Sequence, residues 1–218
     1  MKKSPFLGFY GYWVILTYLS VVSAIVGICF SLWGNTDIAI LCLLISGVCD
    51  MFDGTVARTA KRNAMEKGFG IQIDSLADIV SFGVHPAMIG YALYINSGAI
   101  SLQKTLVVGI ILSVYVLAAL IRLAYFNVTE EEIQGKGGKR ICYEGLPVTS
   151  SAMILPLIYA LWGDLPAMPV IYFAVLLATA LAFVLKFRLP KLKLRTICLF
   201  CAIGLAAMLI SLVLRRPI

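Results

Sequence analysis

The chain has 218 residues, of which 61% are hydrophobic and only 13% charged, and its formal net charge is +7. This apolar content is far above that of water-soluble domains, so the composition excludes an ordinary soluble protein and indicates a membrane protein. The basic residues are scattered over separate loops without an aromatic platform, which argues against a nucleic-acid partner.

Seven apolar runs follow one another along the chain, and most approach the roughly 20 residues that an α-helix needs to span a membrane. These runs are Tyr10–Trp33, Ile38–Val56, Ile71–Ile95, Thr105–Phe126, Pro147–Trp162, Ala167–Leu185 and Thr196–Leu214. The first run is too long for the core of a signal peptide, so we interpret it as a retained helix. We therefore predict an all-α fold in which residues 1–218 form one integral-membrane domain, a bundle of about seven transmembrane helices.

The positions of lysine and arginine predict how this bundle is oriented. With the N-terminus inside, most basic residues fall in inner loops, whereas the predicted outer loops contain only Lys104, as the positive-inside rule requires. Seven helices would place Arg215 and Arg216 outside, against the same rule, so eight helices are the alternative. The expected location is the cell membrane, with several membrane passes.

Four aspartates interrupt the second and third apolar runs. Five residues of the second run share one face of a helix with 3.6 residues per turn: Asp50, Asp53, Gly54, Ala57 and Arg58. Asp74 and Asp78 share one face of the next helix in the same way. The small residues between the acids and the arginine leave space where a leucine would block access.

Carboxylates at membrane depth are costly, and four close together repel one another unless cations neutralise them. Arg58 and Arg122 are the arginines expected at a similar depth, and two arginines cannot compensate four aspartates. Carboxylate oxygens are hard ligands that suit Mg²⁺ or Mn²⁺, and a pair of such ions forms a clamp for displacement at phosphorus. The pattern therefore favours phosphoryl or phosphatidyl transfer at the cytoplasmic face.

The complete motif, Asp50-x2-Asp53-Gly54-x2-Ala57-Arg58 followed by Gly70-x3-Asp74-x3-Asp78, resembles the signature of the CDP-alcohol phosphotransferases. These membrane enzymes replace the CMP of a CDP-linked lipid with an alcohol. The family usually has eight residues between the arginine and the glycine, whereas this chain has eleven, so its linker between the two helices is longer. The resemblance implies a six-helix catalytic core with an extra C-terminal helix, and a homodimer.

The resemblance also implies that the four aspartates hold two divalent cations, Mg²⁺ or Mn²⁺. Asp50, Asp53 and Asp74 would bind the first ion. Asp50, Asp74 and Asp78 would bind the second. Asp78 would in addition act as the general base that takes the proton of the incoming hydroxyl group.

The CDP moiety would be bound by the remaining residues of the motif. Gly54 and Ala57 would allow its close approach, and Arg58 would bind a phosphate with its planar guanidinium group. Thr17 is similar to the residue of the first helix that faces the nucleotide in this family.

Three further segments, residues 73–87, 121–128 and 144–152, are similar to those of the enzymes that transfer the phosphatidyl group of CDP-diacylglycerol to L-serine. This similarity implies that CDP-diacylglycerol and L-serine are the substrates, and that phosphatidylserine and CMP are the products. Arg122 and Asn127 are the candidates for binding the acceptor, and the basic side chain of Arg122 can pair with the carboxylate of serine.

Two other functions are alternatives. The same reaction could use another acceptor, such as glycerol 3-phosphate, inositol phosphate or choline. An ion-coupled transporter could use the aspartates as a cation relay, although the chain has no internal repeat and its acids gather toward one face. The sequence leaves open whether the lipid is an ester or an ether and whether the metal is Mg²⁺ or Mn²⁺.

Overall fold

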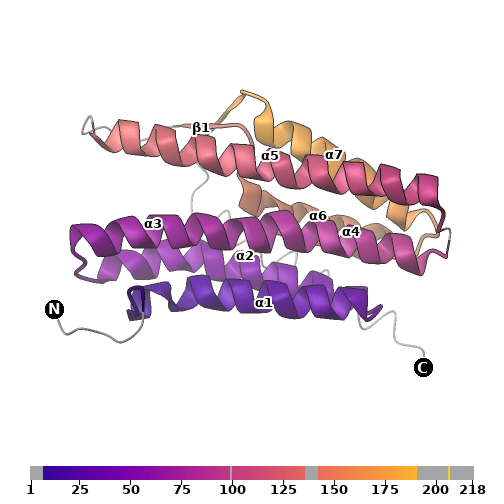
Figure 1. The fold of residues 1–218 in the computed structure, drawn as a ribbon, viewed down its shortest axis with the longest axis horizontal. Helices are drawn as coiled ribbons and strands as arrows, with labels where there is room; N and C mark the ends of the chain where they lie inside the picture. Colours follow the sequence, from indigo (N-terminus) through magenta and orange to yellow (C-terminus); the bar gives the residue numbers. More distant parts are fainter. Residues whose placement is uncertain (1–6, 99, 136–141, 191–205, 207–218) are drawn as a thin grey trace.

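The computed structural model describes residues 7–98, 100–135, 142–190 and 206, and within them the chain runs up and down as a helical bundle (Figure 1). The longer helices are α1 (Ile15–Leu32), α2 (Thr36–Thr59), α3 (Ala64–Asp78), α4 (His85–Asn96), α5 (Leu102–Gly135), α6 (Ser151–Trp162) and α7 (Met168–Val184). Short turns of 3₁₀-helix, η1 (Tyr12–Val14) and η3 (Val148–Ser150), precede α1 and α6. A π-helical segment, η2 (Ile79–Val84), joins α3 to α4 so that they run as one long helix.

Among the described residues, four helical segments are long and apolar enough to cross a membrane: Tyr12–Leu32, Thr36–Thr59, Ala64–Asn96 and Leu102–Glu130. Two shorter apolar helices, Val148–Trp162 and Met168–Val184, follow them. Six of the seven predicted helices are thus present at the predicted places. The seventh, Thr196–Leu214, lies outside the described residues apart from Ala206. The helical membrane bundle is confirmed, and the total of seven helices stays a prediction.

Helix α1 packs closely on α2 because its buried face is built from small residues, among them Ser20, Ala24 and Gly27. Small side chains let two helix backbones approach each other, which matters where lipid supplies no hydrophobic force between helices. Hydroxyl groups bridge the contact: Ser46 Oγ donates to Ser20 O at 3.0 Å, and Ser20 Oγ lies 3.0 Å from Ser81 Oγ in η2. The contact between α1, α2 and η2 is therefore both tight and hydrogen-bonded.

The turn between α2 and α3 sets the relative position of the two helices that carry the aspartates. Helix α2 ends at Thr59 and α3 begins at Ala64. Asn63 caps α3 with a complete capping box: its side chain accepts from Glu66 N at 2.8 Å, and the Glu66 side chain accepts from Asn63 N at 2.8 Å. The tight turn brings the last third of α2 beside α3.

Two features go beyond the helices that the apolar runs predicted. The apolar run Thr105–Phe126 predicted a helix that ends near Phe126, but α5 continues to Gly135. The run TEEEIQ contains good helix formers, and Thr129 Oγ1 donates back to Tyr125 O at 2.9 Å. In addition, β1 (Cys142–Glu144) and β2 (Arg188–Pro190) pair as a short antiparallel ribbon, which apolar periodicity cannot reveal.

The contact between α2 and α6 leads to a prediction about stability. A Cβ atom on Gly47 would lie 2.7 Å from Ala152 Cβ, so we expect Gly47→Leu to push the two helices apart. Overpacking of this kind costs about 1–3 kcal/mol, and the variant should unfold at a lower temperature in detergent. Gly109→Leu is the control, because a Cβ there meets nothing within 4 Å. Equal melting temperatures for the two variants would contradict the packing.

Candidate functional site

The four aspartates lie together near the end of the bundle that holds the α2–α3 turn. One carboxylate oxygen from each of Asp50, Asp74 and Asp78 lies within 4.8 Å of the other two. Asp53 is buried, and the remaining three are partly buried. The antiparallel arrangement of α2 and α3 creates this cluster, because acids spaced one helical turn apart on each helix face acids on the other.

The cluster has the chemistry of a site for a divalent cation. Carboxylate oxygens of Asp50, Asp74 and Asp78 converge, and Asp53 and Asp74 line the same cavity. Within the part of the chain that the structure describes, no lysine or arginine forms an ion pair with any of the four. Converging carboxylates without a basic partner repel one another, and a hard cation such as Mg²⁺ or Mn²⁺ would remove that repulsion.

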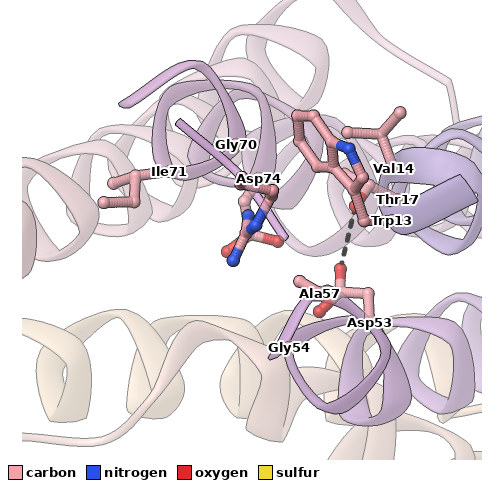
Figure 2. A pocket seen from close by; sticks show the side chains of 10 residues that line it. Trp13, Val14, Thr17, Asp53, Gly54, Ala57, Gly70, Ile71 and Asp74 are labelled. Atoms are coloured by element: carbon pink, nitrogen blue, oxygen red, sulfur yellow. Dashed lines mark hydrogen bonds between the residues drawn. The ribbon is translucent and has the colours of Figure 1, made fainter. Parts of the chain in front are cut away.

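Helix α1 contributes a hydroxyl group to the same place. Thr17 Oγ1 donates to Asp53 Oδ2 over 3.1 Å, and Figure 2 shows this bond crossing between the two helices. A carboxylate that accepts a hydrogen bond is held in one orientation, so Thr17 fixes the oxygens of Asp53. The residue predicted to face the nucleotide therefore touches the acid cluster directly.

An open cavity of about 180 Å³ lies beside the cluster. Its walls contain Trp13, Val14, Thr17, Asp53, Gly54, Ala57, Arg62, Gly70, Ile71 and Asp74, most of which Figure 2 labels. A Cβ on Gly54 would meet nothing within 4 Å, so the space above this glycine is open to a ligand. The structure thus brings together Thr17, Gly54 and Ala57, the positions assigned to CDP, with two of the aspartates.

Arg58, the fourth residue assigned to CDP, is placed differently. It is exposed and does not line the cavity, and its Nη2 donates to Thr55 Oγ1 over 3.3 Å. Trp13 and Arg62 are among the lining residues that were not predicted. Trp13 is one helical turn before Thr17, and this spacing could have indicated it. Arg62 could not be found by helical periodicity, because it lies in the turn after α2.

The two candidates for binding the acceptor both lie on α5. Asn127 Nδ2 donates to Ser75 Oγ over 2.7 Å, and Ser75 follows Asp74 on α3. Arg122 is 5% exposed, donates from Nε to Leu146 O over 3.1 Å, and has its guanidinium carbon 5.5 Å from the Phe126 ring. Asn127 is therefore hydrogen-bonded to α3, the helix that carries Asp74 and Asp78, while Arg122 is hydrogen-bonded to the segment before α6.

His85 has the surroundings of a packing residue. Its side chain is fully buried, and a Cβ on Gly27 would collide with the imidazole ring. Gly27 therefore provides the space that His85 fills between α1 and α4.

A helical bundle with long apolar segments and a partly buried carboxylate cluster defines a multi-pass membrane protein with a candidate divalent-cation site. A model of the CDP-alcohol phosphatidyltransferase family matches residues 14–215. The chain belongs to this family.

Proteins with curated names give more detailed likenesses. The chain is 42% identical over 120 residues to the CDP-diacylglycerol–serine O-phosphatidyltransferase of Saccharomyces cerevisiae, covering 53% of this chain and 40% of that protein. It is 33% identical over 145 residues to the archaetidylserine synthase of Methanothermobacter thermautotrophicus, covering 66% of this chain and 56% of that protein. A Bacillus subtilis CDP-diacylglycerol–serine O-phosphatidyltransferase is 29% identical over 133 residues, covering 61% of this chain and 70% of that protein. The chain spans about half the length of the first two relatives.

The hydrogen bond between Asn127 and Ser75 can be tested by a double-mutant cycle. We expect Asn127→Ala and Ser75→Ala each to lower the free energy of unfolding in mixed micelles by about 1 kcal/mol, because each removes the same bond. The double variant should cost little more than either single variant. Fully additive losses would show that the two side chains act separately.

Proposed function

We propose that this chain transfers the phosphatidyl group of CDP-diacylglycerol to the hydroxyl group of L-serine, giving phosphatidylserine and CMP. The observation that carries the proposal is the cluster of Asp50, Asp74 and Asp78 beside an open cavity at one end of the bundle. Membership of the CDP-alcohol phosphatidyltransferase family supports the reaction class, and the relatives' names agree on serine as the acceptor.

The aspartates would hold two divalent cations. Asp50, Asp53 and Asp74 would bind one, which is supported by Asp53 and Asp74 lining the same cavity. Asp50, Asp74 and Asp78 would bind the other, which their close oxygens support. Such cations would neutralise charge on the diphosphate and make CMP a better leaving group.

The chain's own residues perform the proton transfer and the positioning. Asp78 accepts the hydroxyl proton of serine, the serine oxygen forms a bond to the phosphorus on the lipid side, and the bond from that phosphorus to CMP breaks. A carboxylate is a weak base toward an alcohol, so positioning must supply much of the acceleration. Thr17 holds Asp53 in place, and the small residues Gly54 and Ala57 admit the CDP moiety. Arg58 remains a predicted CDP-binding residue.

Serine recognition is assigned to α5. Arg122 would pair with the carboxylate of serine, and its support is a buried guanidinium group held by the carbonyl of Leu146 and the ring of Phe126. Asn127, bonded to the helix that carries Asp74, would position the acceptor end of the site. In an arginine held in this way, less side-chain entropy is lost when serine binds.

The site is expected to face the cytoplasm of the cell membrane. Lys61, Arg62 and Lys67 lie at or near the α2–α3 turn, at the same end as the acids, and basic loops favour the cytoplasmic side. The whole chain is proposed to act as one membrane domain and as a homodimer, surrounded by membrane lipids.

CMP release by the purified protein in detergent tests the proposed reaction. With CDP-diacylglycerol and Mn²⁺ or Mg²⁺, we expect release that depends on L-serine, and none after chelation of the metal. Asp78→Asn should reduce the rate by at least about 100-fold, because a general base contributes about 10²–10⁴. The matched control is Asp164→Asn, an exposed aspartate in the α6–α7 connection, which should leave the rate unchanged.

Glycerol 3-phosphate, inositol phosphate and choline would be offered separately, and so would an ether-linked CDP-lipid. Release with a different acceptor would keep the reaction class and refute serine. A folded protein that releases no CMP with any acceptor would refute the enzyme and favour ion-coupled transport.

The assignment of Arg122 predicts a change in specificity. We expect Arg122→Gln to raise the KM for serine by about tenfold or more, because a charged hydrogen bond to the carboxylate is lost, while the KM for CDP-diacylglycerol stays the same. Ethanolamine, which has no carboxylate, should be used equally poorly by the variant and the unaltered protein. A fall in kcat with both KM values unchanged would make Arg122 a residue of structure alone.

A further inference from the structure

Arg62 and Trp13 form a stacked pair in the wall of the cavity. The guanidinium carbon of Arg62 lies 5.1 Å from the centre of the Trp13 ring, and both residues line the cavity with Asp53 and Asp74. An aromatic face attracts a guanidinium group through the ring quadrupole and leaves the edge of that group, with its N–H donors, available. Trp13 therefore holds Arg62 at the cavity.

Arg62 has an unused hydrogen-bond donor. Its Nε is buried and has no hydrogen-bond partner, although the side chain as a whole is only partly buried. The aspartates that share the cavity do not form an ion pair with it within the described residues. A buried donor without a partner is costly, and most such groups in proteins are satisfied by something. Because Arg62 lines the cavity, a ligand there can supply acceptors to the N–H groups of its guanidinium.

Gly70 provides the room for this arrangement. A Cβ at this position would lie 3.0 Å from Arg62 Nη1 and 3.1 Å from Trp13 Cζ3. Any larger residue at position 70 would press on both members of the pair. The absence of a side chain at Gly70 therefore lets Arg62 lie between Trp13 and the first turns of α3.

We propose that Arg62 is a further substrate-binding residue, and that it donates hydrogen bonds to a phosphate oxygen of the cytidine diphosphate. The inference rests on the proposed function, and it assigns to Arg62 a contact with the nucleotide diphosphate inside the cavity. The ligand is a diphosphate rather than the serine carboxylate, because Arg62 shares its cavity with the CDP positions Thr17, Gly54 and Ala57. A planar guanidinium with several N–H donors suits phosphate oxygens.

Binding of CDP and of cytidine separates a phosphate contact from other roles. In uncharged detergent with Mg²⁺, we expect Arg62→Gln to weaken CDP binding by about tenfold or more, measured by calorimetry. Cytidine, which has no phosphate, should bind the variant and the unaltered protein equally. Arg62→Lys keeps the charge but loses the planar group, so its CDP affinity should fall between the two. Lys61→Gln is the matched control, because Lys61 is an exposed neighbour with the same charge, and it should bind CDP normally.

The outcomes separate this proposal from the proposed function. If the unaltered protein binds CDP and Arg62→Gln binds it equally well, the contact is refuted while the enzyme stands. If the unaltered protein does not bind CDP at all, both are refuted. Equal losses for CDP and cytidine would show that Arg62 only shapes the cavity. A defect confined to vesicles that contain anionic lipid would assign Arg62 to the membrane surface, and would also refute the contact.

Discussion

Repulsion among four carboxylates inside an apolar bundle is the constraint around which this structure is built. Each acid alone would be costly at that depth, and Asp50, Asp74 and Asp78 bring oxygens within 4.8 Å of one another. Such a cluster persists only if the rest of the fold holds the two helices together. The α2–α3 turn supplies that constraint, because the capping box at Asn63 fixes where α3 begins. The folded bundle therefore holds carboxylates close together at one place, where a bound cation would relieve their repulsion.

A second set of contacts determines how closely α1 can approach this cluster. Ser20, Ser46 and Ser81 bond to one another's backbone or hydroxyl groups, so the polar atoms between α1, α2 and η2 have partners. Because these side chains are small, α1 lies near enough for Thr17 to reach Asp53. A larger residue at position 20 would separate the helices and remove that bond. The close packing of α1 on α2 is thus also what allows Thr17 to orient Asp53.

The sequence revealed most of the bundle and the acid cluster, for a physical reason. Lipid-spanning helices need long apolar runs, and acids such as Asp74 and Asp78, four residues apart, must share a helix face. Periodicity could not reveal the polar end of a helix or a pairing between distant strands. The extension of α5 beyond Phe126 is polar, and the β1–β2 ribbon pairs segments more than forty residues apart. Spacing also could not tell that Arg58 is exposed while Thr17 touches Asp53.

The contrast between Arg58 and Arg62 shows how a turn can deliver a side chain that a helix cannot. The two arginines are four residues apart, and on a continuous helix both would lie on one face. Helix α2 instead ends at Thr59, and Ala60 adopts an extended conformation with ψ of 137°. The chain then reverses direction before α3, and this reversal places Arg62 against Trp13 in the cavity wall. The linker between the helices therefore does more than connect them. Its conformation places the positively charged side chain of Arg62 in the wall of a cavity that Asp53 and Asp74 also line.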